Sequence, residues 1–157
     1  MSKALISCLL SVILAGCGLD ETLHRADKPV SREAAAKDVE LPFPASARDV
    51  YYVVHSGGMQ EFQKFVRFTV DAKELDGTVS TVLEDHDKKM GKRFTYLNLP
   101  LSQAPRSAEI RQLSPVPIPW WDPESITNGY YRGTTNGQPF YLWVDESRHI
   151  IYLCQTD

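Results

Sequence analysis

The stretch Phe140-Tyr-Leu-Trp-Val-Asp145, followed by Ile150-Ile-Tyr-Leu-Cys-Gln155, decides the fold of this chain. Nearly every position in both runs is β-branched, aliphatic or aromatic, and the turn-forming segment 145–148 separates them. Successive strand residues point to opposite faces of a sheet, and here both faces are apolar. The pattern therefore predicts two neighbouring central strands of a sheet that is covered on both sides.

Working outward, residues 130–132 complete a carboxyl-terminal three-strand meander, with a turn at 134–137 that carries Asn136-Gly137. Residues 49–54 and 62–70 predict two more antiparallel strands, joined by a glycine turn that begins at His55-Ser56-Gly57-Gly58. The sheet is therefore expected to be mostly antiparallel.

One main helix is expected between these two groups of strands. Asp71 and Glu74 have the spacing of a capping box, and Gly91 supplies a stop after the helix ends near Lys89. One apolar face is predicted to contain Leu75, Val79, Val82, Leu83 and His86. The element order predicts an α+β fold in which this helix packs on one face of the sheet.

The segment between the helix and the meander is less regular. Short strands are expected at 94–97 and 109–113, followed by an extended arm at 115–119, where prolines alternate. Asp122-Pro123-Glu124 has the composition of a helix start and predicts a helix of one or two turns. Residues 41–157 are predicted to form a single globular domain.

The amino terminus has the pattern of an export signal. Lys3 precedes an apolar run that ends in Leu14-Ala-Gly-Cys17, and this run is too short to span a bilayer. The segment resembles the signal of bacterial lipoproteins, which implies cleavage after residue 16 and acylation of Cys17. Residues 17–40 are then expected to be the lipidated cysteine and a flexible tether, which a local helix around Arg32 to Lys37 would shorten. Gly18, in place of the aspartate typical of inner-membrane retention, implies the periplasmic face of the outer membrane.

Charge and cysteine content narrow the function. The chain has 17 basic and 20 acidic side chains, and cleavage removes only Lys3 from this count, which leaves a net charge near −4. This balance gives no reason to expect a nucleic-acid partner. Cys8 leaves with the signal and Cys17 takes the lipid, so Cys154 has no disulfide partner and is expected to be a buried hydrophobic residue.

The chain contains no recognisable enzyme or cofactor motif. A nucleophile elbow, a P-loop, the H-E-x-x-H motif and paired C-x-x-C motifs are all missing. An enzyme would have to use His55, Ser56 and the acidic residues of Asp85-His86-Asp87. Neighbouring residues on a helix point about 100° apart, so the side chains of residues 85–87 are not expected to converge on one metal ion. The sequence predicts no catalytic site, no metal and no cofactor.

Aromatic side chains supply the candidate binding surface. Adjacent tryptophans rarely share one core, and exposed aromatic residues dominate binding energy. The candidate surface consists of Trp120, Trp121, Tyr130, Tyr131 and Tyr141. The alternative is that Trp121 packs onto Ile126 as part of the core. The basic cluster, defined as Lys88, Lys89, Lys92 and Arg93, either meets anionic lipid or an acidic partner, or is a solvated helix end.

Three blocks carry a resemblance to a group of proteins. They are Leu41-Pro-Phe-Pro-Ala-Ser-Ala47, Trp121-Asp-Pro-Glu-Ser-Ile126, and Leu142-Trp-Val-Asp145 with Tyr152 and Gln155-Thr-Asp157. The mature domain resembles uncharacterised exported bacterial proteins, often lipoproteins, and the resemblance implies no activity. The leading prediction is a non-enzymatic envelope lipoprotein that binds a protein, with an immunity-type lipoprotein against a periplasmic toxin as a subclass. A small-ligand or lipid-binding module is the alternative.

Overall fold

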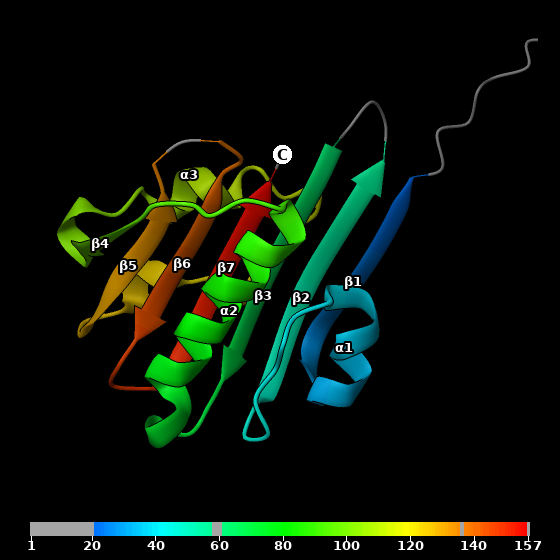
Figure 1. Cartoon of the computed structure of the whole chain (residues 1–157). Helices are drawn as coiled ribbons and strands as arrows, with labels where there is room; N and C mark the ends of the chain where they lie inside the picture. Colours follow the sequence, from blue (N-terminus) through cyan, green and yellow to red (C-terminus); the bar gives the residue numbers. More distant parts are fainter. Residues whose placement is uncertain (1–20, 58–60, 136, 157) are drawn as a thin grey trace, which may run out of the picture.

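A single antiparallel sheet organises the computed structural model, which describes residues 21–57, 61–135 and 137–156. The sheet has seven strands in the order β1-β2-β3-β7-β6-β5-β4, and every neighbouring pair within the described residues is antiparallel (Figure 1). The strands are β1 (Thr22–Val30), β2 (Arg48–Gly57), β3 (Glu61–Thr69), β4 (Tyr96–Pro100), β5 (Gly129–Thr134), β6 (Phe140–Asp145) and β7 (Ile150–Thr156). The predicted α+β class and the carboxyl-terminal meander β5-β6-β7 are confirmed.

The two apolar runs that decide the fold lie at the centre of the sheet. β7 pairs with β3 on one side and with β6 on the other, and every β7 residue except Gln155 is buried. Leu142 and Leu153 face the helical side, which we call the front, whereas Trp143 and Tyr152 face the back. Both faces of these two strands are apolar because the sheet is covered on both sides, as predicted.

The front face is covered by helices. α2 (Leu75–Met90) runs across β7 and β3 (Figure 1). Its predicted apolar face is confirmed, because Leu75, Val79, Val82 and His86 are buried and Leu83 is partly buried. The helix ends at Gly91 with φ of 64°, the left-handed conformation that favours glycine. None of the helices in the described part of the chain is long and apolar enough to cross a membrane.

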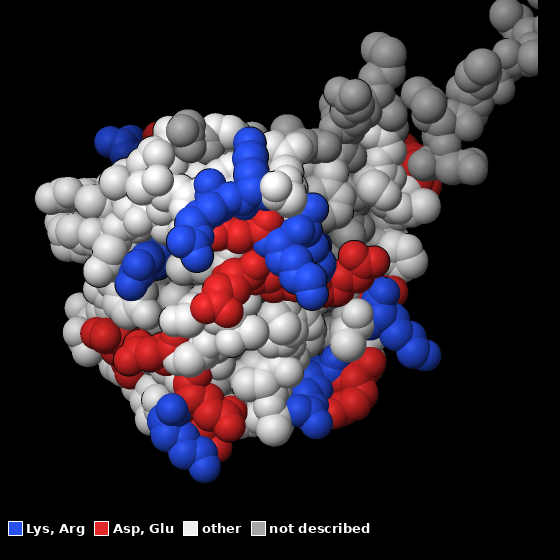
Figure 2. All heavy atoms as spheres, viewed as in Figure 1, with Lys and Arg blue, Asp and Glu red and all other residues white. Residues whose placement is uncertain are grey.

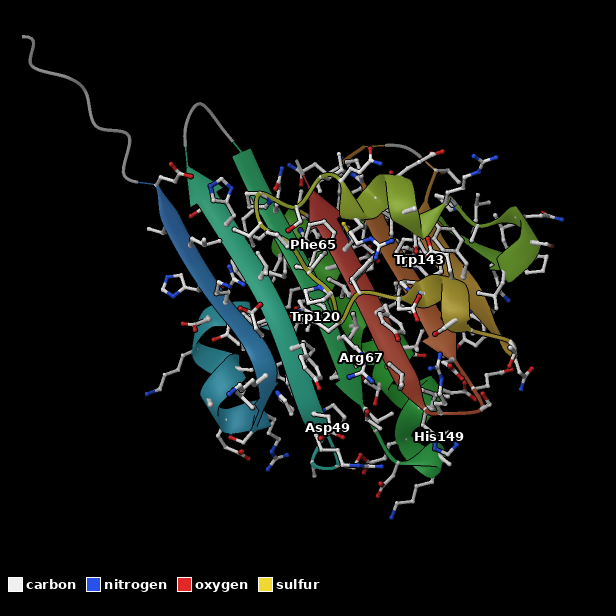
Figure 3. The ribbon with its side chains drawn as sticks, turned by 180° about the vertical axis from the view of Figure 1, so that it is seen from behind. Asp49, Phe65, Arg67, Trp120, Trp143 and His149 are labelled. Carbon is white, nitrogen blue, oxygen red and sulfur yellow. The ribbon has the colours of Figure 1, made fainter. Side chains whose placement is uncertain are left out.

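The back face is covered by irregular structure. The segments η2 (Leu101–Gln103), α3 (Ser107–Arg111) and η3 (Pro123–Ser125) lie over it with the proline arm, whose Ile118 is buried (Figure 3). Trp121 is fully buried and meets three rings edge-on, with centroid distances of 5.1 Å to Phe65 and 5.6 Å to both Trp143 and Tyr152. An aromatic core thus lies beneath the arm.

The predicted tether is wrong for residues 22–39. β1 pairs with β2 at the edge of the sheet, and α1 (Arg32–Val39) follows it. Only Ala26 of β1 is buried, so an exposed edge strand gives no apolar alternation in the sequence. Ser31 caps α1 by accepting a hydrogen bond from the backbone N–H of Ala34. The ordered domain therefore begins before the predicted boundary at residue 41.

Two local predictions are also corrected. Residues 109–113 do not form a strand, because Ile110 belongs to α3, whose Ala, Glu and Arg residues are good helix formers. The capping box of Asp71 does not form either. Instead, the hydroxyl of Ser46 accepts a hydrogen bond from the Asp71 N–H and donates to the Glu74 carboxylate. A residue distant in sequence therefore bridges the two members of the expected capping box.

Candidate functional site

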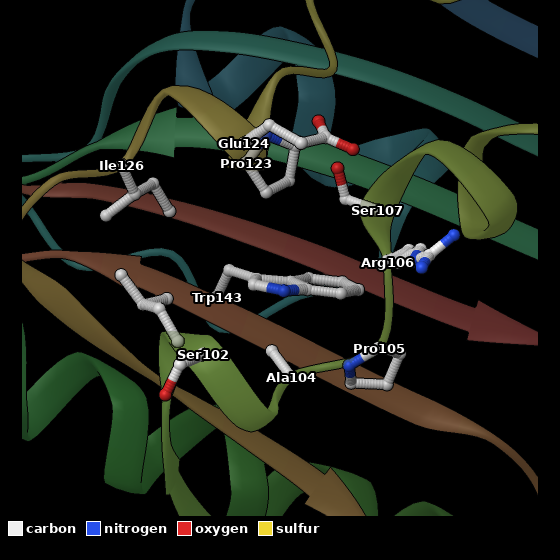
Figure 4. A pocket seen from close by; sticks show the side chains of 10 residues that line it. Ser102, Ala104, Pro105, Arg106, Ser107, Pro123, Glu124, Ile126 and Trp143 are labelled. Atoms are coloured by element: carbon white, nitrogen blue, oxygen red, sulfur yellow. The ribbon is translucent and has the colours of Figure 1, made fainter.

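A cavity of about 270 Å³ opens on the back face between residues 101–107 and 123–126 (Figure 4). Its floor is the indole of Trp143 from β6, which is 2% exposed. We call this cavity the Trp143 pocket. Ring contacts with Trp121 at 5.6 Å and Tyr131 at 5.4 Å hold the floor in place. The aromatic core therefore supports a fixed apolar surface at the base of the pocket.

Apolar walls and a few polar groups complete the Trp143 pocket. Leu101 and Ala104 form one wall, and Pro123 and Ile126 form the other. Ser107 lines the pocket at the start of α3, and its buried hydroxyl has no hydrogen-bond partner among the described residues. An unpaired buried hydroxyl costs about 1–3 kcal/mol, so a bound group that pairs with it gains this free energy back.

Charges of both signs flank the entrance of the pocket. The Glu124 carboxylate and the Arg106 guanidinium belong to exposed residues. Arg106 makes only a loose pair with Glu109, with 3.7 Å between Nη1 and Oε1. The pocket can therefore take an apolar or aromatic group on Trp143, bond its polar end to Ser107, and contact either charge at the rim.

The five predicted surface aromatics do not form one surface. Trp121 is fully buried and Tyr131 is 3% exposed, so both belong to the back core. Trp120 is partly buried and stacks on Tyr51 with a centroid distance of 5.8 Å. Tyr141 is partly buried against the same core, whereas Tyr130 packs on the front core. A groove lined by all five is therefore not present in the structure.

The residues that an enzyme would have used are also separated. His55 is buried on the back face, where its Nε2 lies 2.8 Å from Oε1 of Glu21. The neighbouring Ser56 points to the front, where its hydroxyl is 2.7 Å from that of Thr22. The structure does not bring this histidine and serine together.

The triplet 85–87 is divided among three structural roles. Asp85 pairs with Lys89 at 3.0 Å, and Asp87 accepts hydrogen bonds from the Phe94 N–H and the Tyr96 hydroxyl. His86 is buried, and its Nδ1 lies 2.7 Å from the Tyr96 oxygen. Burial lowers the pKa of His86 and thus favours the neutral ring. Among the described residues, no three His, Cys, Asp or Glu side chains converge as metal ligands.

The remaining cysteine is structural. Cys154 is fully buried in the back core, and burial raises the pKa of its thiol well above the ordinary value. A thiolate nucleophile is therefore disfavoured at this position. Cys17, the predicted acylation site, lies outside the described residues.

Sequence reasoning missed the residues of the Trp143 pocket. Trp143, Ser107 and Glu124 come from segments separated by at least sixteen residues, and no motif joins them. Each of the two irregular segments that line the pocket contains a proline, Pro105 or Pro123, and these prolines are the only local sequence feature that marks them. Comparison of the chain with protein-family models, curated proteins and solved structures finds no match.

Proposed function

We propose that this chain is a lipid-anchored protein of the bacterial cell envelope, acylated at Cys17 and held at the periplasmic face of the outer membrane. The lipobox Leu14-Ala-Gly-Cys17 supports acylation, and Gly18 supports the outer membrane. A multiply acylated cysteine makes a durable anchor, because each buried methylene contributes about 0.8 kcal/mol. The domain is then permanently present at a membrane surface.

The domain is a non-enzymatic module that binds a protein partner, and the Trp143 pocket receives one side chain of that partner. The size of the pocket carries this proposal. Pockets for whole drug-sized ligands occupy roughly 300–1,000 Å³, whereas this one measures about 270 Å³. A volume at the lower limit suits an aromatic or aliphatic side chain, and the charged rim suits the polar surroundings of a protein interface.

One observation favours a second candidate function. The unpaired hydroxyl of Ser107 would also pair with a polar group of a small ligand stacked on Trp143. In this version the domain is a small-ligand-binding module, and the ligand is a compact molecule with one apolar face. Isothermal titration with envelope glycans and lipids tests it, since heat that disappears in the Ser107→Ala variant supports a ligand and no heat removes this candidate.

Acylation is tested by metabolic labelling. Cells that express the full chain are fed labelled palmitate, and the Cys17→Ala variant serves as the comparison, with Cys154→Ala as the control. We expect label and membrane fractionation for the native chain and the control, and neither for Cys17→Ala. Equal labelling of the Cys17→Ala variant would refute the anchor.

Protein binding is tested by filling the pocket. Ala104→Trp places an indole over Trp143, whereas Gln103→Trp adds the same group at an exposed neighbouring position outside the pocket. We expect Ala104→Trp to reduce recovery of a crosslinked partner at least about tenfold, the equivalent of 1.4 kcal/mol, and Gln103→Trp to leave it unchanged. An immunity role adds that deletion sensitises cells to attack by sibling cells, and unchanged survival would remove that subclass.

A further inference from the structure

The register of the sheet places the anchor and the basic cluster at one end of the domain. Because neighbouring strands alternate in direction, the first residue of β1, Thr22, lies at the same end as the start of β6, Phe140. The carboxyl-terminal part of α2 reaches this end as well, since the His86 and Phe140 rings are 4.3 Å apart. Figure 1 shows α2 finishing at the end where β1 begins.

The basic cluster projects from this end of the domain. Its four members are all exposed, and Lys89 pairs with Asp85. In the described part of the chain, Lys88, Lys92 and Arg93 have no carboxylate within 4.0 Å. Figure 2 shows Lys and Arg side chains around the end of α2, with Asp and Glu side chains directly beside them. The Lys92 ammonium lies 4.7 Å from the centroid of the Phe94 ring, a contact that leaves its charge unpaired. The three groups therefore have no described carboxylate partner that an external anion would have to displace.

The chain between the acylation site and the sheet is short. Four residue steps separate Cys17 from Glu21, so the linker reaches at most about 14 Å. β1 lies two strands from β3, over which α2 packs, and two strand spacings are roughly 10 Å. A lipid at Cys17 thus holds this end of the domain near the bilayer. The short linker lets the basic cluster approach the headgroups to within the screening length of about 10 Å.

We propose that the basic cluster contacts the phosphates of anionic phospholipid headgroups in the membrane that carries the anchor. The proposal rests on acylation of Cys17 and adds a fixed orientation, with the carboxyl-terminal end of α2 toward the bilayer. Leu23 and Leu97, which are 43% and 41% exposed, lie at the same end of the domain, but the register places both on the back face, opposite α2.

The orientation is tested on the acylated full chain in two kinds of vesicle, pure phosphatidylcholine and an equal mixture of phosphatidylcholine and phosphatidylglycerol. A membrane-impermeant amine reagent labels the lysines, and mass spectrometry reads each position. Lys73, exposed at the opposite end of α2, is the internal reference. In the anionic vesicles we expect labelling of Lys88 and Lys92 to slow about fivefold relative to Lys73, and high salt to remove the difference.

Charge reversal provides the matched control. Lys89 should share the slower labelling in the anionic vesicles. The Lys88→Glu/Lys92→Glu variant should lose this protection of Lys89, whereas Lys28→Glu, which changes an exposed lysine at the far end and retains the reference Lys73, should keep it. Equal labelling in both vesicles, from a sample that floats with them, refutes the orientation and leaves the anchor standing. A sample that lacks the acyl mass at Cys17 and does not float refutes the anchor and the orientation together.

Discussion

The two faces of the sheet are stabilised in different ways. The front core is mainly aliphatic, with contributions such as Val66 and Leu153, and the helices α2 and α1 cover it. The back core is mainly aromatic, and turns, a five-residue helix and a proline arm cover it. The front core is built from regularly spaced apolar residues of helices and strands. The back core depends on a few large side chains, and above all on Trp121. The regular face supports the fold, and the irregular face forms the pocket.

The largest expected effect comes from removing the centre of the aromatic face. Trp121→Ala should lower the free energy of unfolding by about 3–5 kcal/mol, because a large buried side chain leaves a cavity. Val82→Ala on the front removes two buried carbon groups and should cost about 2 kcal/mol. Urea denaturation of both variants measures the difference. Equal losses of unfolding free energy in the two variants would contradict a special dependence of the back face on Trp121.

The next effect concerns the turn that joins β6 to β7. Asp145 is fully buried and accepts hydrogen bonds from the backbone N–H groups of Ser147 and Arg148 and from the Ser147 hydroxyl. Burial acts to raise the pKa of Asp145, but these hydrogen bonds and the Arg148 charge outweigh it and lower the pKa below its usual value. Asp145→Asn should cost about 2 kcal/mol.

The sign of the pH dependence follows from this lowered pKa. The contribution of Asp145 is fully present above the unfolded carboxyl pKa of about 3.9 and is lost as the pH falls through the folded pKa. Urea denaturation at neutral and acidic pH should therefore show a smaller difference between the native chain and Asp145→Asn in acid. The exposed Asp122, changed to Asn, is the control. A difference that does not shrink in acid would contradict this assignment.

A smaller, pH-dependent effect distinguishes the front face. The pKa of His86 is lowered by burial, so the unfolded chain binds a proton more readily than the folded one. Stability from the neutral ring is present above the unfolded pKa of about 6.5 and decreases as the pH falls below it. The Tm should drop between pH 7.5 and 5.5, and His86→Leu should flatten that drop, whereas His24→Gln, at an exposed position, should not. An unchanged slope in His86→Leu would show that other groups cause it.

The smallest effect increases stability. Gly77 lies within α2, and a Cβ added there meets no atom within 4 Å. Gly77→Ala should raise the free energy of unfolding by about 0.5–1 kcal/mol, since glycine loses more conformational freedom in a helix. Gly91→Ala at the end of the same helix should lower it by a similar amount, because φ there is +64°. Thermal melts of both variants decide the signs, and a loss in Gly77→Ala would reveal an unrecognised constraint.

The contrast between the faces also explains what the sequence could predict. The 3.6-residue period of α2 and the apolar runs of β6 and β7 are local patterns, so the front face and the meander follow from them. The edge strand β1 does not follow from the sequence because Ala26 is its only buried residue, whereas the local helix expected around Arg32 to Lys37 is present as α1. The capping box does not follow from the sequence, because Ser46, which bonds both Asp71 and Glu74, approaches them only in the folded chain.

The candidate site was less accessible to sequence reasoning. The adjacent tryptophans 120 and 121 do not form the predicted binding surface, because Trp121 is fully buried in the core and the floor of the pocket is Trp143. Whether Trp120 or Trp121 is buried depends on how the proline arm crosses the sheet. Irregular segments such as this arm have no periodic pattern from which their path could be predicted. The unpaired hydroxyl of Ser107 is likewise a property of packing and not of any motif.

Site-specific photo-crosslinking in living cells tests the central claim that the irregular face is the binding face. A photoreactive amino acid replaces Glu124 at the rim of the Trp143 pocket in one strain and the exposed Lys73 on the helical face in another. We expect one crosslinked protein at position 124, lost when Ala104→Trp fills the pocket, and none at position 73. A crosslink at position 73 alone, or one at 124 that survives Ala104→Trp, would contradict it.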